Sequence, residues 1–241
     1  MRIVYLEKND ITNEYVTSNT YSAWQGFWLL GYECIPFTWN QMDWLNITKE
    51  TVVNGYIRVA RKAFQILGVP EPAEVSIPDE LQEFAGRKMW KSTLKEVREN
   101  EALVFIKPLD GHKLFNGHLR TGILRDAIYT ASFPDDTKIL VSEPVTFISE
   151  YRGFVLDGKL IGWKHYSGDF RKSPDISIVE AAIKQYKTAP IAYSIDFGLD
   201  DKDRSLLVEV NDAFALGSYG LEHTLYARMI EARWDEIVGN V

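Results

Sequence analysis

The chain has 241 residues, of which 46% are hydrophobic, and a net charge of −7. This length allows one large domain or two small ones with a substantial core, whereas the acidic balance argues against a protein that binds nucleic acid or an anionic membrane. The single cysteine, Cys34, excludes an internal disulfide and a cysteine-rich zinc site.

The first part of the chain predicts a small α/β unit. Residues 3–6 are an apolar run that soon meets charge, which is typical of a buried strand and not of a signal peptide. The sequence has no run of about 18 apolar residues, which a membrane-spanning helix would need. A cytoplasmic location is therefore expected. A helix over 21–31 and a strand over 32–37 follow. Further helices are predicted over 53–67, from Pro78 onward, and over about 92–98.

The second part of the chain is rich in predicted strands, and this change places a domain boundary near residue 100. Strands are predicted over 102–107, 139–141, 146–149, 152–156 and 159–164. Asp157-Gly158 between the last two is a two-residue hairpin signal. Helices are predicted over 176–186 and 221–238, with a hairpin between them.

The hairpin near the C-terminus carries two acids on one face. Folding it symmetrically about the turn between Lys202 and Asp203 places Asp196 opposite Glu209, and alternation puts Asn211 on the same face. Two carboxylates and an amide oxygen are suitable ligands for Mg²⁺ held together with nucleotide phosphates. The alternative is a solvated hairpin face that carries two acids.

Two further groups of residues indicate an anionic ligand. Lys107 ends an apolar strand and precedes a glycine-containing loop with Lys113, an arrangement that suits a polyphosphate; a surface lysine beside a turn is the alternative. Arg152 and Lys164 lie nearly opposite each other around the Asp157-Gly158 turn, and two cations so close together indicate an anionic ligand. The alternative is that Glu150 or Asp169 neutralises them.

These motifs, in this order, resemble the ATP-grasp superfamily, and in particular the clade in which lysine replaces a usual arginine, here Lys164. The resemblance implies an α+β ATP-grasp fold, with an N-terminal α/β domain over about 1–100, a small lobe over about 101–143 and a large lobe over about 144–241. The motifs are Phe105-Ile106-Lys107-Pro108, the glycine loop, the joint Glu143-Pro144-Val145, Ser149-Glu150-Tyr151-Arg152, Gly162-Trp163-Lys164, Asp196, Glu209-Val210-Asn211 and Ala215 to Leu221.

The resemblance also implies a role for each candidate residue, with ATP and Mg²⁺ as cofactors. Lys107, Lys113, Gly111 and Gly117 would hold the phosphates, Glu143 and Val145 would frame the adenine, and Glu150 would bind the ribose. Asp196, Glu209 and Asn211 would hold Mg²⁺, and Arg152 and Lys164 would face the γ-phosphate or an acyl-phosphate. A second phosphate-binding lysine is expected at Lys88 or Lys91. Tyr166, Asp169, Arg171 and Tyr219 are candidates for the acceptor side.

The implied activity is that of an ADP-forming carbon–nitrogen ligase, which joins a carboxylate to an amine through an acyl-phosphate. The carboxylate and amine would come from amino acids, peptides or proteins, and a homodimer is one possible assembly. A catalytically silent nucleotide-binding module is the alternative. A nucleotidyl-transfer enzyme is a third possibility, against which the acidic charge and the motif order both argue.

Overall fold

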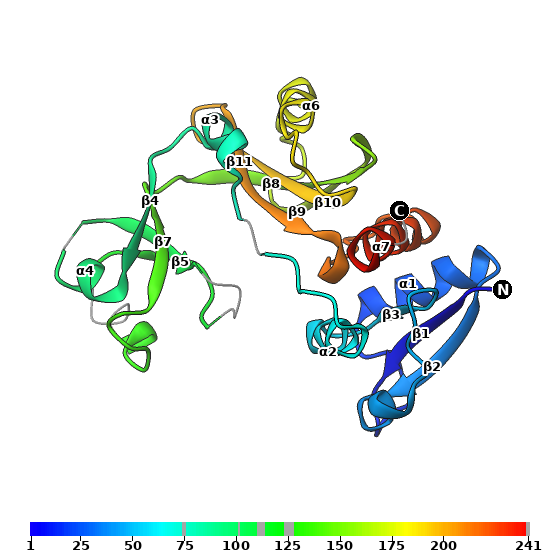
Figure 1. The fold of residues 1–241 in the computed structure, drawn as a ribbon. Helices are drawn as coiled ribbons and strands as arrows, with labels where there is room; N and C mark the ends of the chain where they lie inside the picture. Colours follow the sequence, from blue (N-terminus) through cyan, green and yellow to red (C-terminus); the bar gives the residue numbers. More distant parts are fainter. Residues whose placement is uncertain (74–75, 101, 110–113, 123–127, 240–241) are drawn as a thin grey trace.

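Three sheets organise the structure. The computed structural model describes residues 1–73, 76–100, 102–109, 114–122 and 128–239. A parallel three-stranded sheet near the N-terminus is followed by two antiparallel four-stranded sheets. Figure 1 shows helix α7 (His223–Val238) between the large-lobe sheet and the N-terminal sheet. Within the described ranges, no helix is long and apolar enough to cross a membrane.

The N-terminal domain is the predicted α/β unit with one additional strand. Its sheet has the order β2-β1-β3, and the predicted helix over 53–67 begins only at Ile57 because buried Val52 and Val53 pair with β1 instead. Helix α1 begins before residue 21, since the Thr17 side chain accepts a hydrogen bond from Thr20 N–H. The elements are β1 (Ile3–Lys8), α1 (Ser18–Leu29), β2 (Glu33–Thr38), the 3-10 helix η1 (Trp39–Trp44), β3 (Val52–Asn54) and α2 (Ile57–Leu67).

The small lobe is an antiparallel sheet of order β4-β7-β5-β6. The helix predicted over about 92–98 is wrong in its first part, because Met89–Thr93 pairs with β7 and Thr93 then caps a shorter helix through a capping box with Glu96. The sheet therefore includes a strand that lies before residue 100. The elements of this lobe are β4 (Met89–Thr93), α4 (Leu94–Arg98), β5 (Val104–Pro108), β6 (His118–Arg120) and β7 (Lys138–Ser142). The short helices η2 (Asp79–Leu81) and α3 (Gln82–Ala85) precede β4 in the chain but pack against the large-lobe sheet, where Leu81 and Ala85 join its buried residues.

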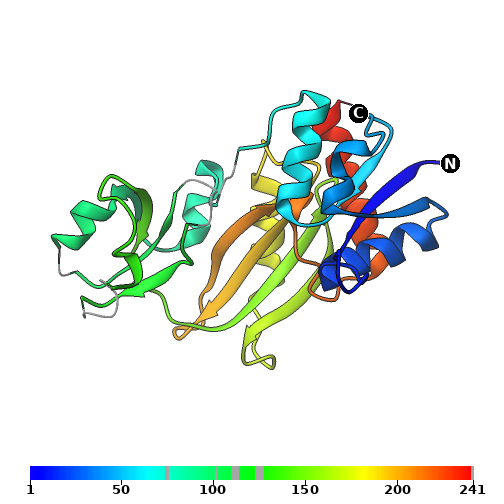
Figure 2. The same cartoon turned by 90° about the horizontal axis from the view of Figure 1, so that it is seen from below.

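The large lobe is a sheet of order β11-β10-β8-β9. The strands predicted over 146–149 and 152–156 are one strand, β8, and the hairpin prediction is confirmed, since Asp157 and Gly158 both have positive φ. Figure 2 shows the long strands of this sheet between the small lobe and the N-terminal domain. The elements are β8 (Phe147–Leu156), β9 (Lys159–Gly168), α6 (Ile176–Gln185), β10 (Ala192–Asp200), β11 (Ser205–Asp212), the 3-10 helix η3 (Ala213–Ala215) and α7.

The hydrophobic core joins the N-terminal domain to the large lobe. One cluster of buried residues runs from β1, α1 and α2 through α7 to Phe154 of the large sheet. Helices α1 and α7 approach so closely that a Cβ atom at Gly26 would lie 1.9 Å from the carbonyl oxygen of His223. The small lobe has a separate cluster around Ile106, Ile139 and Val141. The small lobe thus packs as its own unit beside the large sheet.

Candidate active site

Four charged side chains form one row across the large sheet. The register pairs Glu209 with Asp196, Asp196 with Arg152, and Arg152 with Lys164, so the predicted pairings of Asp196 with Glu209 and of Arg152 with Lys164 are confirmed. Laterally paired residues point to the same face of a sheet. The row therefore has two acids on β11 and β10, followed by two bases on β8 and β9.

The centre of this row is a buried ion pair. Arg152 donates from Nε and Nη2 to the two carboxylate oxygens of Asp196, over 2.8 and 2.6 Å, and the two residues are only 7% and 1% exposed. Burial raises the pKa of Asp196 to about 6, and this effect outweighs the opposing interaction with Arg152. The carboxylate is therefore held in place, and its protonation is sensitive to nearby cations.

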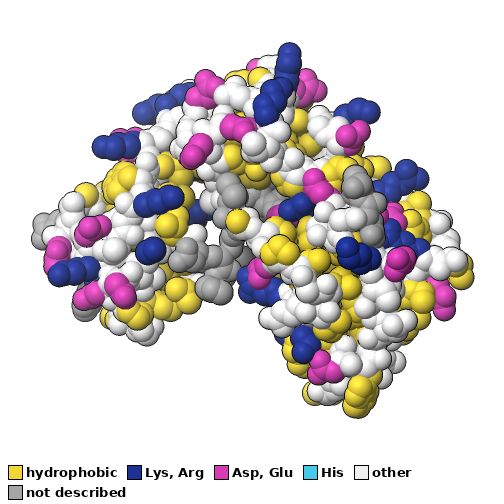
Figure 3. All heavy atoms as spheres, viewed as in Figure 1, with side chains coloured by type: hydrophobic (Ala, Val, Ile, Leu, Met, Phe, Trp, Pro, Cys, Tyr) yellow, Lys and Arg dark blue, Asp and Glu magenta, His cyan; other side chains and the backbone are white. Residues whose placement is uncertain are grey.

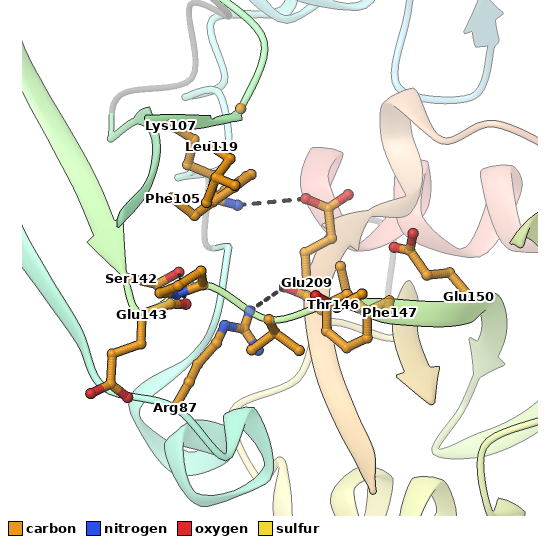
Figure 4. A pocket seen from close by; sticks show the side chains of 14 residues that line it. Arg87, Phe105, Lys107, Leu119, Ser142, Glu143, Thr146, Phe147, Glu150 and Glu209 are labelled. Atoms are coloured by element: carbon orange, nitrogen blue, oxygen red, sulfur yellow. Dashed lines mark hydrogen bonds and ion pairs between the residues drawn. The ribbon is translucent and has the colours of Figure 1, made fainter. Parts of the chain in front are cut away.

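Glu209 links this row to the small lobe. Its Oε2 lies 3.5 Å from Nζ of Lys107 on β5, and its Oε1 accepts a hydrogen bond from Asn211 Nδ2 over 2.9 Å. Burial favours the neutral carboxyl group, but Lys107, Asn211 and Arg152 together lower the pKa of Glu209. Lys107 also donates to the hydroxyl of Ser76. Figure 4 shows Lys107 and Glu209 pointing toward each other from the two lobes.

A pocket of about 410 Å³ lies between the two lobes. Figure 3 shows the hollow between the small lobe and the rest of the molecule. Cationic, anionic and apolar side chains share its walls, which is typical of a site for a polar ligand with an apolar part. The lining residues are Arg87, Phe105, Lys107, Gly117, Leu119, Ser142, Glu143, Pro144, Val145, Thr146, Phe147, Glu150, Val208 and Glu209.

Five of the seven residues predicted to bind the nucleotide line this pocket, namely Lys107, Gly117, Glu143, Val145 and Glu150. The Glu143 carboxylate points away from the cavity in Figure 4 and accepts a hydrogen bond from the backbone N–H of Lys88 over 2.9 Å. Glu150 accepts a hydrogen bond from the Tyr166 hydroxyl over 3.0 Å. Gly111 and Lys113 lie outside the described residues.

Lys164 lies half-buried at the outer end of the charged row. In the described parts of the chain its ammonium group has no hydrogen-bond or ion-pair partner, whereas Arg152 beside it is held by Asp196. Asp169 and Arg171, two candidates for the acceptor side, pair with each other over 2.9 Å. Among the bases of the row, Lys164 is therefore the one whose charged group makes no hydrogen bond or ion pair within the described residues.

Arg87 is a pocket residue that the sequence analysis missed. It donates to the carbonyl oxygens of Ala85 and Leu207 over 2.9 and 2.8 Å, and it lies against the Phe147 ring. Neither Lys88 nor Lys91 is among the lining residues, and the Lys88 ammonium lies over the exposed Trp90 ring instead. Its one signal in the sequence is a basic residue directly after Gly86.

The fold, the charged row and the pocket between two lobes define an ATP-grasp protein. Residues 84–229, more than half of the chain, match the family described as ATP-grasp domain, R2K clade family 2. The chain belongs to this family, which confirms the predicted resemblance and fold. No curated protein matches it in sequence.

Solved structures with the same fold are remote in sequence. D-alanine–D-alanine ligase from Bacillus anthracis has a TM-score of 0.58 at 12% identity, with 100% of this chain and 99% of that chain covered. D-cycloserine synthetase DcsG has a TM-score of 0.58 at 11% identity, with 96% and 99% covered. The ATP-grasp ligase PsnB, complexed with a minimal precursor, has a TM-score of 0.54 at 12% identity, with 100% of both chains covered. The family assignment, with these neighbours, supports an ATP-dependent ligase in general terms.

Proposed function

We propose that this protein is an ADP-forming carboxylate–amine ligase that uses ATP and Mg²⁺. The observation that carries the proposal is the approach of Lys107 from the small lobe to Glu209 of the large lobe, 3.5 Å apart at the wall of the pocket. An ammonium group and a carboxylate that meet across two lobes can separate to admit a nucleotide phosphate and its cation.

The nucleotide would lie in the pocket with its phosphates toward Lys107. Glu143 and Val145 would border the adenine through their backbone groups, since the Glu143 side chain is turned outward. Glu150 would accept the ribose hydroxyls, and Arg87 adds a cation that the sequence analysis did not include. Gly111, Lys113 and Gly117 remain the proposed cover over the triphosphate.

The donor set of Asp196, Glu209 and Asn211 fits Mg²⁺. All three supply oxygen atoms, which this hard cation prefers, and the number of ligands is small, as is usual for Mg²⁺ held jointly with phosphates. Among the described residues, no group of three His, Cys, Asp or Glu side chains forms a metal cluster, and the proposed set has two carboxylates and one amide. When bound, the ion would neutralise phosphate charge as the reaction proceeds.

Basic side chains of this protein would support two successive steps of the ligase reaction. A substrate carboxylate oxygen forms a bond to the γ-phosphorus while the bond to the bridging oxygen of ADP breaks, which gives an acyl-phosphate and ADP. The amine nitrogen then bonds to the acyl carbon, the carbon–oxygen bond breaks, and inorganic phosphate leaves as the amine loses a proton. Lys107 would hold the ATP phosphates, and Arg152 and Lys164 would stabilise the transferred phosphoryl group and the tetrahedral oxyanion.

The carboxylate or amine substrate is proposed to be an amino acid, a peptide or a protein. Support comes from the fold alone: one ligase and one macrocyclase, each solved with a precursor peptide, share it at TM-scores of 0.54 and 0.50. A catalytically silent nucleotide-binding module is the second candidate. The bidentate pair between Arg152 and Asp196 favours it, because both carboxylate oxygens of Asp196 already accept a hydrogen bond and the residue is only 1% exposed.

Release of ADP from ATP and Mg²⁺, measured across pairs of acids and amines, tests the proposal. At least one pair should raise ADP release above the ATP-only rate, and Glu209→Gln should lower that rate by orders of magnitude because it removes a metal-binding charge. Glu180→Gln, at an exposed position of α6, is the matched control and should change little. Nucleotide binding without ADP release for any pair would favour the silent module.

A further inference from the structure

The loop over residues 216–221, called here the tyrosine loop, holds an unusual backbone conformation next to Arg152. Tyr219 has a φ of 43°, in the left-handed region that side chains other than glycine rarely adopt. Gly220 follows with a φ of 74°. A strained residue persists only where its surroundings fix it, and such residues cluster at functional sites. The contacts of Tyr219 should therefore explain why the loop keeps this conformation.

The ring of Tyr219 lies over the guanidinium group of Arg152. The distance from the guanidinium carbon to the ring centroid is 4.5 Å, within the range of a cation–π contact. A Cβ atom at position 217 would lie 2.9 Å from the Tyr219 ring, so Gly217 leaves the space that the ring needs. The ring also contacts Tyr166, with 5.4 Å between centroids.

Arg152 has one occupied edge and one available edge beneath this ring. Its Nε and Nη2 donate to Asp196, as described above, whereas Nη1 has no acceptor among the described residues. Nη1 lies on the side of the tyrosine loop, 3.7 Å from where a Cβ atom at position 217 would be. A guanidinium group held by one edge and one face can present its remaining N–H donors to an oxyanion in a fixed direction.

The N-terminal domain holds the tyrosine loop in place. Asn19 of α1 accepts hydrogen bonds from the backbone N–H and the hydroxyl of Ser218 over 2.9 and 3.1 Å, and Ser218 is 5% exposed. On the other side of the loop, the Tyr226 hydroxyl donates to the carbonyl of Leu216. The conformation of Tyr219 thus depends on a contact between two domains.

We propose that Tyr219 is a positioning residue, which keeps the Nη1 edge of Arg152 directed at the phosphoryl group, and that the N-terminal domain acts on it through Asn19. The role of Arg152 rests on the proposed ligase function, but the hold of the ring on Arg152 does not. Tyr219→Phe keeps the ring and should behave like the parent protein. Tyr219→Leu removes the ring, and Asn19→Ala should act in the same direction with a smaller effect.

Hydrogen exchange of the Arg152 Nε–H measures directly how firmly the Tyr219 ring restrains the guanidinium group. The exchange is followed by ¹⁵N–¹H NMR, and the signal is assigned by its loss in Arg152→Lys. We expect a two- to thirtyfold faster exchange in Tyr219→Leu, which corresponds to about 0.5–2 kcal/mol for a cation–π contact. Tyr21→Leu, at a tyrosine of α1 with nearly equal exposure, is the matched control. Equal exchange in Tyr219→Leu and the parent would overturn the proposal, as would a Tyr219→Phe variant that exchanges as fast as Tyr219→Leu.

Turnover distinguishes this inference from the proposed function. With an acid–amine pair that supports ADP release, Tyr219→Leu should lower kcat without changing the KM for ATP, and Tyr219→Phe should restore it. A Tyr219→Leu variant with parental kcat, beside an inactive Glu209→Gln, would sink the positioning role while the ligase stands. Absence of ADP release in the parent would contradict the ligase, and the exchange measurement would still decide whether Tyr219 holds Arg152.

Discussion

Removal of Arg152 tests the energetics of the charged row. Arg152→Met keeps an unbranched side chain but leaves the carboxylate of Asp196, which is 1% exposed, without its bidentate partner. At a pH where Asp196 is ionised, breaking a buried pair in this way costs about 3–5 kcal/mol, because one charge then stays buried and uncompensated. For a chain of this size each kcal/mol lowers Tm by about 2–4 °C, so the expected loss is about 6–20 °C.

Thermal unfolding of the nucleotide-free protein measures this loss, and two variants make it specific. Arg171→Met removes an exposed arginine from its pair with Asp169 and should change stability by less than about 0.5 kcal/mol. Asp196→Asn, added to Arg152→Met, removes the uncompensated charge and should restore much of the stability. The reasoning is refuted if Arg152→Met is no more destabilising than Arg171→Met, or if the double variant is less stable than Arg152→Met alone.

Three further predictions concern the cations, the pH and the domain contact. Lys107→Met should weaken ATP binding by at least tenfold in calorimetry, while Lys202→Met in the exposed β10–β11 turn should leave it unchanged. Burial raises the pKa of Asp196 from the ordinary 3.8 to about 6, so the contribution of its protonated carboxyl group to stability is present below about pH 4 and is lost as the pH rises through 6. Mg²⁺ needs the ionised carboxylate, so Mg²⁺-dependent nucleotide binding should weaken as the pH falls through about 6. A constant affinity from pH 8 to 5 would contradict this prediction. Gly26→Ala should lower Tm by several degrees because its Cβ atom would meet the His223 carbonyl at 1.9 Å, whereas Gly31→Ala meets no atom within 4 Å and should show only the cost of its positive φ.

The sequence predicted the parts of the site that lie within hairpins. The pairing of Asp196 with Glu209 and that of Arg152 with Lys164 each cross one short turn, so counting from the turn was sufficient to find them. The contact between Arg152 and Asp196 was not predicted, because it requires β8 to lie beside β10, and both β9 and α6 separate these two strands in the chain. The order of strands in a sheet depends on tertiary packing, which no local sequence pattern indicates.

The missed elements have equally physical causes. Residues 89–93 include Lys91 and Ser92, which carry little strand propensity, and only pairing with β7 makes this segment a strand. The short strand β3 was absorbed into the following helix, since a three-residue strand has too few positions for a period of two to appear. Arg87 and the contact of Tyr219 with Arg152 depend on side-chain placement across elements distant in the chain.

Thermal unfolding with ATP and EDTA, and with ATP and Mg²⁺, shows whether the protein has a nucleotide site that requires Mg²⁺. ATP at about 100 times its dissociation constant should add about 2.7 kcal/mol, which is a rise in Tm of roughly 5–10 °C. We predict that this rise needs Mg²⁺ and is absent in Glu209→Gln, while Glu180→Gln retains it. A folded parent protein whose Tm is the same in both mixtures would contradict an ATP and Mg²⁺ site between the two lobes.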